Sequence, residues 1–381
     1  MDTTPNNKKK FLFIYLKTGG GHLAPARSLS KYLEKHNKEE VEVILVDGFE
    51  KTKRYARFIV EDGYRILQSK FKWLYELIYA IHKVRIFSEI SSYLVSIHME
   101  KYLSELIQKE RPEKIVLFHF FAIKPVYKII KELNLNIPVI TIVTDPYSPP
   151  PLWFLNKNQN FILFSEELKN RCMKKGIDPM NIKVFDFVLD EKYSKVATQE
   201  EILSYKKKFG FQKEKVLLIL GGGDGIPNGI QILKSILKLN SAFEIAVVCG
   251  KNKEFYEQAN KIIIHDKYDN LKIYGFVDFV YELISISDVV ISKCGASTFM
   301  ELLISGKIQI VNSFLWEQEK GNVDFLTRNS LGIYEKRISK LPAIINQMFT
   351  DNEILQQYKK NIASFNFENG IAKVASFLLD Q

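Results

Sequence analysis

Short apolar runs alternate with amphipathic segments along most of this chain. Two stretches follow the same order: an apolar strand, a cluster of glycines and an amphipathic helix. The first stretch covers 11–16, 18–22 and 23–36, and the second covers 215–220, 221–225 and 231–240. Doubly wound nucleotide-binding domains begin with a strand that ends in glycines and leads into a helix. The pattern therefore predicts two such domains in one chain.

Further apolar runs of strand length follow each glycine cluster. They lie at 41–47, 114–120, 138–144, 161–165 and 182–187 in the N-terminal half, and at 243–250, 271–277, 289–295 and 307–314 in the C-terminal half. Predicted helices separate most of them, and strands that alternate with helices form parallel sheets covered on both faces. We therefore expect an α/β fold of two Rossmann-like domains that face each other across a cleft.

The charged stretch 190–212 contains no strand and predicts the boundary between the two domains. Thr198 is followed three residues later by Glu201, which is a capping-box pattern, so a helix is expected to start within this linker. We expect an N-terminal domain at 1–195 and a C-terminal domain at 196–381.

A long insertion at 49–113 interrupts the first predicted domain, and its composition indicates helices. Residues 51–85 contain nine lysines and arginines against three acidic residues, with seven tyrosines, phenylalanines and tryptophans among them. This composition is typical of helices that lie at a membrane surface, where rings reach headgroup level and cations meet anionic lipid. A helical layer with an aromatic core and solvated lysines is the other interpretation. The residues expected to contact membrane or acceptor are Lys70, Lys72, Trp73 and Tyr75.

Composition narrows the class of protein. With 46% hydrophobic and 26% charged residues among 381, the chain is an ordinary globular protein. Its formal net charge of +10 favours anionic partners such as nucleotides, anionic lipids or nucleic acid. The three cysteines form no paired motif, which indicates a reducing, cytosolic setting and no zinc site. No run of about 18 apolar residues predicts a transmembrane helix, so any membrane contact is expected to be peripheral.

The first glycine cluster ends in His22. Gly19, Gly21 and Ala24 fit a loose dinucleotide-binding pattern, and Asp47 ends the next predicted strand, where an acid can bind a ribose. An imidazole at the start of the helix suits a general base, because its ordinary pKa of about 6.5 lies near ambient pH. A histidine that caps its own loop is the alternative.

A second group of polar residues follows the strand at 289–295. The glycines of 221–225 are not a P-loop, since no G-K-[ST] follows, but they can line a phosphate or a sugar. Ser297 and Thr298 start a helix whose free N–H groups favour a diphosphate, and Glu301 one turn later can reach a ribose diol. The polar run 317–322 offers carboxylates and amides to sugar hydroxyls. An ordinary capped helix with a solvated loop remains the other interpretation.

Five segments together carry a resemblance to a known family. TGGGHLAPARSL, VTDPYSPPPLWF, LGGGDG, SKCGASTFMELLISG and EQEKGNVDFL resemble the monogalactosyldiacylglycerol synthase and processive diacylglycerol glycosyltransferase family, of the two-domain GT-B fold. The resemblance implies inverting transfer of galactose or glucose from a UDP-sugar to a lipid hydroxyl such as that of diacylglycerol. It further implies a cytoplasmic enzyme at the inner face of the cell membrane. No D-x-D or His/Cys cluster is placed to hold a metal, so we expect no metal and no cofactor besides the donor.

The resemblance also implies roles for particular residues. His22 matches the family's base, and Asp145 lies at its T-D position, where it can orient or assist that base. Phe276 matches the position that stacks on uracil. By the same correspondence Ser297 and Thr298 bind the diphosphate, Glu301 the ribose, and Gln318 with Glu319 the sugar. The full set of expected UDP-sugar contacts is Gly21, Gly222, Gly223, Phe276, Gly295, Ser297, Thr298, Glu301, Gln318, Glu319 and Asn322.

Two departures from the family lie on the acceptor side. The run Pro149–Pro151 stands where the family usually has a histidine, and 185–193 replaces a proline-containing segment. The segment Gly20–Ala26 also resembles the transferase that adds N-acetylglucosamine to a polyprenyl-linked peptidoglycan precursor, which is the alternative function. An NAD-dependent oxidoreductase and a nucleic-acid binder are less well supported. The sequence leaves open glucose or galactose, the lipid acceptor, processivity and the oligomeric state.

Overall fold

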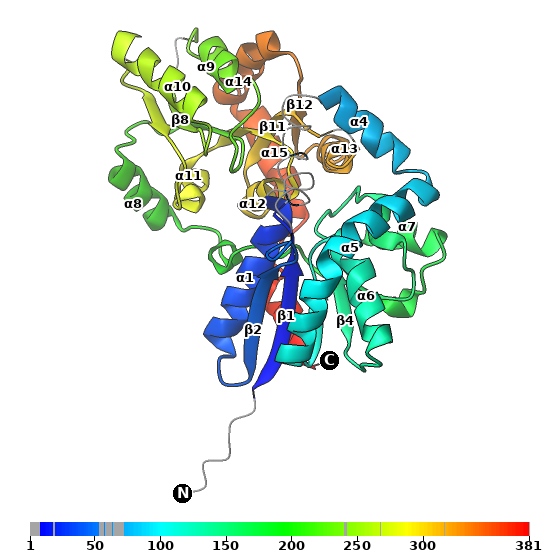
Figure 1. Cartoon of the computed structure of the whole chain (residues 1–381). Coiled ribbons are helices and arrows are strands. Elements are labelled where there is room, and N and C mark those ends of the chain that lie inside the picture. The colour runs from blue at the N-terminus through cyan, green and yellow to red at the C-terminus, as the bar shows by residue number, and fades with distance from the viewer. Residues whose placement is uncertain are drawn as a thin grey trace, which may run out of the picture. The chain divides into compact units, whose positions relative to one another are not determined.

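The computed structural model describes residues 8–17, 20–52, 57, 63, 72–239, 242–266, 268–315 and 317–380. The chain divides into two compact units (Figure 1). The first comprises Met1–Glu191, Trp316–Gln318 and Asn369–Gln381, and the second comprises Lys192–Leu315 and Glu319–Glu368.

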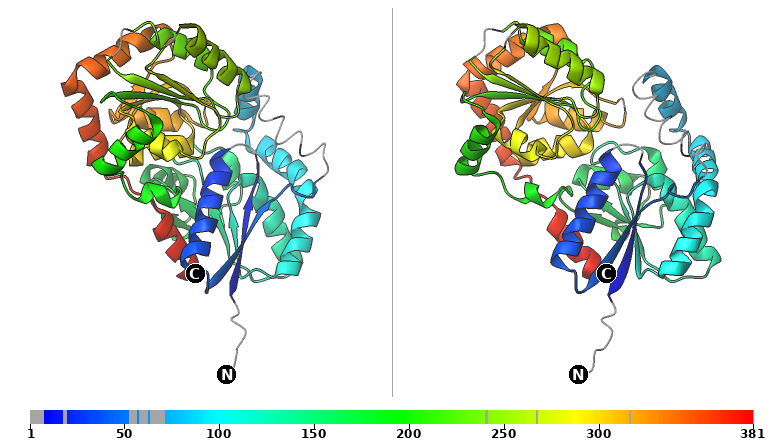
Figure 2. Two further views of the ribbon diagram at one scale, coloured as in Figure 1. Left: turned by 90° about the vertical axis from the view of Figure 1, so that its left-hand side faces the viewer. Right: turned by 60° about the vertical axis from the view of Figure 1, so that its left-hand side comes forward.

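A six-stranded parallel sheet in the order β2-β1-β3-β4-β5-β6 forms the centre of the first unit. Its strands are β1 (Lys9–Tyr15), β2 (Val41–Asp47), β3 (Lys114–Leu117), β4 (Val139–Ile142), β5 (Asn160–Leu163) and β6 (Ile182–Val184). The helices are α1 (Gly20–His36), α4 (Lys72–Ile81), α5 (Arg85–Glu110), α6 (Ile123–Glu132), α7 (Glu166–Lys174) and α16 (Ile371–Asp380). Helices α1 and α16 pack together on one face of the sheet, and α5 packs with α6 on the other (Figure 2).

The second unit has its own six-stranded parallel sheet, in the order β12-β11-β10-β7-β8-β9. Its strands are β7 (Val216–Leu220), β8 (Glu244–Val248), β9 (Leu271–Tyr274), β10 (Val289–Lys293), β11 (Ile308–Ser313) and β12 (Gly332–Tyr334). The helices are α8 (Gln199–Phe209), α9 (Gly229–Ile236), α10 (Lys253–Asp266), α11 (Val280–Ile286), α12 (Ala296–Ile304), α13 (Lys320–Arg328), α14 (Leu341–Thr350) and α15 (Asn352–Ser364).

The predicted α/β fold with two doubly wound sheets is confirmed. Each of the eleven predicted strands is present, and the central ones are buried along their whole length, as in β7 and β3. This continuous burial follows from helices on both faces of a parallel sheet. The strand β12 was not predicted, because its three residues give too short an apolar run.

The linker helix begins where the capping box predicts. The Thr198 N–H donates to Glu201 Oε2 at 2.8 Å, and the Glu201 N–H donates to Thr198 Oγ1 at 3.2 Å. The compact units, however, divide after Glu191 and not after residue 195, and the last residues return to the first unit. The reason is that α16 packs on α1 and buries Val374 and Leu378. The structure thus differs from the expected C-terminal domain at 196–381.

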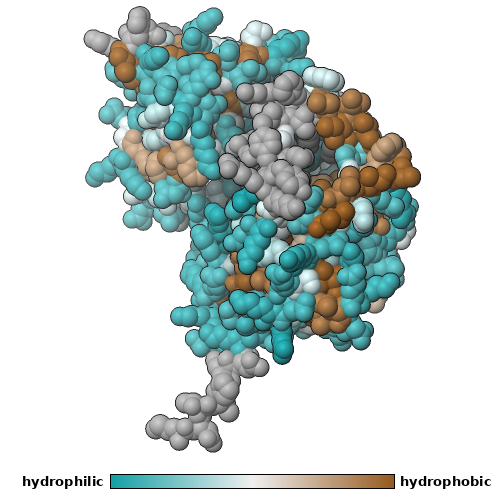
Figure 3. Space-filling view, in the orientation of Figure 1, coloured by the Kyte–Doolittle hydropathy of each residue, from teal (hydrophilic) through white to brown (hydrophobic). Residues whose placement is uncertain are grey.

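Helices α4 and α5 form the described part of the long insertion. Within the residues that the structure describes, no helix has both the length and the hydropathy to cross a bilayer. The surface over α4 and α5 carries a gathering of hydrophobic side chains (Figure 3). Of the expected membrane contacts, Lys70 lies outside the described residues, as do the side chains of Lys72 and Tyr75, whereas Trp73 is 67% exposed.

Candidate active site

Each sheet has one switch point, where the connections between consecutive strands run to opposite sides, and a predicted site residue follows a strand at each of these points. In the first sheet this point lies between β1 and β3, and in the second it lies between β7 and β10. Ligands of doubly wound folds bind outside the carboxyl ends of the strands at such a switch point. His22 follows β1, and Ser297 follows β10.

His22 is buried in the first turn of α1. The helix begins at Gly20, so His22 is its third residue and not its first as predicted, because the helix extends back into the glycine cluster. The side chain is 6% exposed, and its Nδ1 lies 2.7 Å from Thr144 Oγ1. Burial lowers the pKa of His22, while the charge of Asp145 and a hydrogen bond with the Phe118 backbone act in the opposite direction. The imidazole is therefore neutral near pH 7, the state that a general base requires.

A second histidine, His119, packs directly against the first. The two ring centroids are 4.4 Å apart with the rings edge to face. Nδ1 of His119 accepts the Phe121 N–H at 3.2 Å and caps the short 3₁₀ helix Phe120–Ala122, which places the His119 proton on Nε2. Burial and the neighbouring His22 lower the pKa of His119 well below its usual value. His119 was not predicted as a site residue, because residues 118–120 were expected to belong to a strand.

Asp145 follows β4, with its carboxylate held at both oxygens. The Trp153 indole N–H donates to Oδ2 at 3.1 Å, and the side-chain amide of Gln318, which belongs to the same unit, donates to Oδ1 at 3.2 Å. Asp145 is 6% exposed, and Trp153 is fully buried. Pro151, one of the prolines that depart from the family pattern, begins the 3₁₀ helix Pro151–Phe154, which positions Trp153. Trp153 was not predicted as a site residue, because its contact with Asp145 depends on this helix.

Asp47, the acid of the weak dinucleotide pattern, is occupied by neighbouring groups. Its Oδ1 accepts the Phe49 N–H at 3.0 Å, and its Oδ2 lies 3.3 Å from Lys17 Nζ and 3.6 Å from an Arg57 guanidinium nitrogen. Lys17 and Arg57 both lie beside this carboxylate, so a ribose would have to displace these contacts to bind it. The geometry therefore does not favour an NAD-dependent oxidoreductase.

In the second unit the glycine turn after β7 requires glycine for steric reasons. A Cβ on Gly221 would lie 2.0 Å from backbone atoms of Gly225 and Ile226, and Gly222 has a φ of +73°. A Cβ on Gly222 would lie 4.0 Å from Thr298 Oγ1 and 3.8 Å from Lys293 Cε. The turn therefore faces the N-terminus of α12. Gly223 accepts a hydrogen bond from the Lys251 N–H at 2.8 Å, which fixes the other side of the turn.

The start of α12 offers backbone donors and a nearby cation. Gly295 at the N-cap provides no side-chain cap for the helix. Among the described residues, Ser297 Oγ is buried without a hydrogen-bond partner. Lys293 Cε lies 3.8 Å from where a Cβ on Gly295 would be, so this lysine adjoins both the glycine turn and the helix start. Helix N-termini with a neighbouring cation bind phosphate groups well. Lys293 was not predicted, because its strand was assigned from apolar residues alone.

The polar loop before α13 is tied to the end of β10. The Asn322 side-chain amide donates to the Cys294 carbonyl at 2.9 Å. Glu319 is 7% exposed; its Oε2 accepts the Leu315 N–H at 2.6 Å, and its Oε1 lies 3.3 Å from the Cβ position of Gly295. The solvated-loop interpretation is therefore wrong for Glu319 and Asn322, whose side chains are buried.

The remaining predicted donor contacts are placed as follows. Phe276, just after β9, is 65% exposed, with the Lys251 ammonium 5.2 Å from its ring centroid. Glu301 lies in the second turn of α12 and is half-buried. Gly21 lies in the first turn of α1, where an added Cβ would meet no atom within 4 Å. Gln318 falls in the first unit, with Asp145, and not with Glu319.

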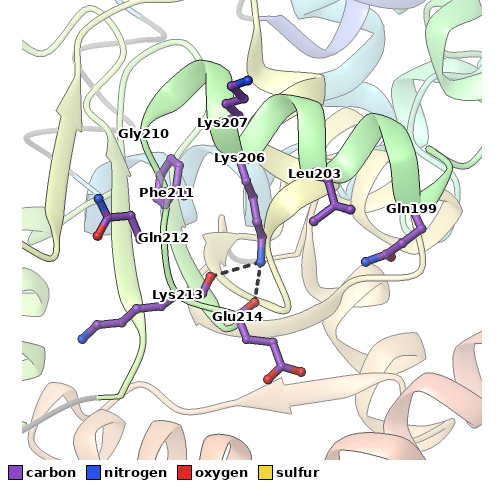
Figure 4. Close-up of a pocket in the computed structure, with 9 residues that line it drawn as sticks. All are labelled: Gln199, Leu203, Lys206, Lys207, Gly210, Phe211, Gln212, Lys213 and Glu214. Carbon is purple, nitrogen blue, oxygen red and sulfur yellow. Dashed lines mark hydrogen bonds between the residues drawn. The ribbon is translucent and has the colours of Figure 1, made fainter.

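A cavity of about 610 Å³ lies beside α8 in the second unit (Figure 4). Lys206 crosses it and donates to the backbone carbonyls of Lys213, at 3.2 Å, and Glu214. None of the predicted site residues lines this cavity.

The comparisons with known proteins cover both units. Residues 22–188 match the family model described as monogalactosyldiacylglycerol (MGDG) synthase, and residues 216–374 match the glycosyltransferase family 28 C-terminal domain. The chain belongs to the monogalactosyldiacylglycerol synthase and processive diacylglycerol glycosyltransferase family. The family suggested by the sequence motifs is confirmed.

Members of this family resemble the chain over nearly its whole length. It is 25% identical to the processive diacylglycerol beta-glucosyltransferase of Bacillus pumilus, over 99% of this chain and 96% of that protein. It is 24% identical to the chloroplastic monogalactosyldiacylglycerol synthase of Spinacia oleracea, over 91% of this chain and 67% of that protein. The names of these two relatives differ in the sugar they specify.

Solved structures confirm the GT-B fold. Acinetobacter baumannii MurG superposes with a TM-score of 0.61 at 13% identity, over 98% of this chain and 100% of MurG. Anabaena Alr3699/HepE, solved in complex with UDP and glucose, gives a TM-score of 0.57 at 12% identity, over 98% of each chain. Likeness at this identity concerns the fold alone.

Proposed function

We propose that this family member transfers glucose or galactose from a UDP-sugar to the hydroxyl of a lipid such as diacylglycerol, with inversion at the sugar carbon. The observation that supports it most is the buried, neutral His22 beside Asp145 at the switch point of the first sheet. The name of the B. pumilus relative specifies glucosyl transfer to diacylglycerol, and that of the S. oleracea relative specifies synthesis of monogalactosyldiacylglycerol. We further propose that the enzyme acts in the cytoplasm, associated with the anionic inner face of the cell membrane.

On the acceptor side, His22 removes the proton of the lipid hydroxyl as its oxygen attacks C1 of the hexose. The bond from C1 to the UDP oxygen breaks from the opposite face, which inverts the configuration. The imidazolium that forms gains a favourable interaction with Asp145, whose charge raises the pKa of His22. Trp153 and Gln318 hold that carboxylate in place.

On the donor side, the leaving diphosphate gains negative charge in the transition state. We assign its stabilisation to the N–H groups at the start of α12, the hydroxyls of Ser297 and Thr298, and the Lys293 ammonium. The proximity of Lys293 Cε and Thr298 Oγ1 to the glycine turn supports this assignment. Phe276 supplies an exposed ring for uracil, and Glu301 supplies a carboxylate for the ribose diol. Gln318 and Glu319 are assigned to the sugar hydroxyls. Because protein groups supply the positive charge, we propose that the reaction needs no metal.

Changing Glu301 to alanine is expected to weaken UDP binding by about 10- to 100-fold, since a hydrogen bond to a charged group contributes about 1.5–3 kcal/mol. Titration calorimetry with UDP measures the effect. Glu257→Ala, an exposed position on α10, serves as the matched control and should bind UDP like the wild type. Unchanged affinity in Glu301→Ala would refute the ribose assignment.

A transfer assay tests the function as a whole. Purified protein is incubated, with and without excess EDTA, with detergent micelles that contain either short-chain diacylglycerol or a polyprenyl-linked acceptor. The labelled donor is UDP-glucose, UDP-galactose or UDP-N-acetylglucosamine. Labelled lipid from a UDP-hexose, undiminished by EDTA, is expected. Loss of transfer in EDTA would refute the metal-free mechanism. Transfer only from UDP-N-acetylglucosamine, to a polyprenyl-linked acceptor, would favour the peptidoglycan-type reaction.

A further inference from the structure

A continuous apolar face runs along α4 and the first half of α5. Of the twenty large hydrophobic side chains that are exposed among the described residues, ten lie between Trp73 and Ile97. Trp73 and Leu77 are spaced four residues apart on α4, as are Ile86, Ile90 and Leu94 on α5. Residues at this spacing share one side of a helix. We call these exposed side chains between Trp73 and Ile97 the α4–α5 apolar face (Figure 3).

The first half of α5 has the reverse of the usual amphipathic arrangement. Its buried side carries Ser88, Ser92 and Ser96, all at most 3% exposed, whereas its large apolar residues point to solvent. A surface helix of a globular protein normally buries its apolar stripe. Two of these serines satisfy their hydroxyls locally, since Ser88 donates to the His82 carbonyl and Ser96 to the Tyr93 carbonyl. The core of the first unit therefore does not use the apolar side of this half-helix.

Charge is nearly absent from the exposed side of this segment. Nine residues are exposed between Val84 and Ile97, and all except Arg85 and Glu89 are apolar or aromatic. Those two pair with each other, with Arg85 Nε 2.7 Å from Glu89 Oε1. A protein partner would need hydrogen-bonding groups to meet, about one bond for each 100–200 Å² of interface. A face whose two charged groups already satisfy each other suits acyl chains better.

The flanking sequence supplies the complementary charge for a membrane. Residues 51–97 contain nine lysines and arginines and four acidic residues. The turn between α4 and α5 places the exposed Lys83 and Arg85 at the border of the apolar face. Lys83 pairs with Glu317 at 2.9 Å and Arg85 with Glu89, so a lipid phosphate would have to compete with these exposed ion pairs. Cations at the edge of an apolar helix face meet lipid phosphates when the apolar side chains enter the acyl region.

From these observations we infer that the α4–α5 apolar face inserts into the interfacial layer of a lipid bilayer and holds the first unit where a lipid acceptor is available. This inference rests on the proposed function for the identity of the acceptor. It also changes the mode of binding expected from the sequence, because burial of apolar side chains is the main contribution and electrostatic attraction the smaller one. Binding should therefore largely persist in high salt, which screens exposed charges.

Vesicle flotation with the full chain tests the inference. The vesicles contain phosphatidylcholine alone or phosphatidylcholine with phosphatidylglycerol, at salt concentrations of about 0.1 M and about 1 M. The wild type is expected to float with both kinds of vesicle and at both salt concentrations. Ile90→Asn/Leu94→Asn should lower the partition coefficient by about 100-fold or more, since burying each side chain contributes about tenfold or more. The control Leu203→Asn changes a residue of matched exposure, 58% against 56% for Leu94, and should float like the wild type.

Tryptophan emission gives a second measurement that does not depend on the asparagine variants. Trp73 is 67% exposed, so its insertion into lipid shifts the emission to shorter wavelength. Vesicles should produce this shift in the wild type, and Trp73→Phe should abolish it. The absence of any shift together with unchanged flotation of the double variant would overturn the inference. If the double variant instead converts a wild-type dimer to a monomer and floats normally, the face is an interface between two copies.

The test of membrane binding can fail or succeed independently of the test of the proposed function. The double variant should still transfer hexose to short-chain diacylglycerol in micelles, because no residue of the candidate active site is changed. A wild type that floats but transfers no sugar to any acceptor would refute the proposed function and leave the membrane face intact.

Discussion

Turnover of the enzyme with His22 replaced by alanine is expected to be about 10² to 10⁴ lower than that of the wild type, the usual loss when a general base is removed. The reason is the environment of this imidazole: it is buried, neutral near pH 7 and held by Thr144 at 2.7 Å. UDP binding should be unchanged, because Ser297, Thr298 and Glu301, which are assigned to the diphosphate and the ribose, belong to the second unit. Initial rates at saturating donor, together with UDP calorimetry, measure both effects.

His36→Ala is the matched control for this variant. His36 lies at the other end of α1, on the surface, where it contacts Glu191 at 2.8 Å. Its loss should leave turnover within about twofold of the wild type. Near wild-type turnover in His22→Ala would refute the assignment of His22 as the base, regardless of the turnover of His36→Ala.

Replacing Asp145 by asparagine should lower turnover by about 10- to 100-fold and move the acid limb of the pH profile to lower pH. The two effects have one cause, because the charge of Asp145 raises the pKa of His22 and stabilises the imidazolium that forms. An opposite charge at close range shifts a pKa by about 1–3 units, and each unit is a factor of ten. Burial already lowers the pKa of His22, so the wild-type kcat/KM should fall only below about pH 6.5.

The sign of the shift separates this account from a purely structural role for Asp145. Loss of the carboxylate removes an interaction that favours the charged imidazole, so the limb moves toward acid. Asp186→Asn, at a half-exposed carboxylate that pairs with Lys373, should leave the limb in place. A limb that moves to higher pH in Asp145→Asn would contradict the assignment.

Local signals in the sequence were sufficient for the fold. Each sheet begins with an apolar strand that ends in glycines, and the close approach of Gly221 to Gly225 and Ile226 shows why no other residue fits there. The capping box of Thr198 likewise predicted the start of α8. The return of α16 to the first unit was not foreseen, because it depends on packing against α1, more than three hundred residues earlier in the chain.

The candidate site was predicted less completely, since its missing members depend on contacts between distant segments. His119 touches His22 across nearly a hundred residues, and Trp153 reaches Asp145 only through the turn that Pro151 begins. Lys293 was not predicted as a site residue, because it ends a strand that is otherwise mostly apolar. Contacts between such distant segments depend on the order of the strands in the sheet, which cannot be derived from a single sequence.

The extent of the apolar face in the insertion was also not predicted from the sequence. Its charge and aromatic content indicated a membrane surface at 51–85, but its apolar face extends to Ile97. Nothing in the sequence shows that α5 turns Ser88, Ser92 and Ser96 inward. That orientation depends on the packing of α5 against distant segments of the first unit, among them α6.

The most direct test of the proposed reaction is the mass and anomeric configuration of the lipid made from an α-linked UDP-hexose and diacylglycerol. We expect diacylglycerol that has gained a hexose in β linkage, determined by mass spectrometry and proton NMR. An α-linked product would contradict direct attack by an oxygen that His22 deprotonates. Release of free hexose with no glycolipid at all would contradict transfer to a lipid hydroxyl.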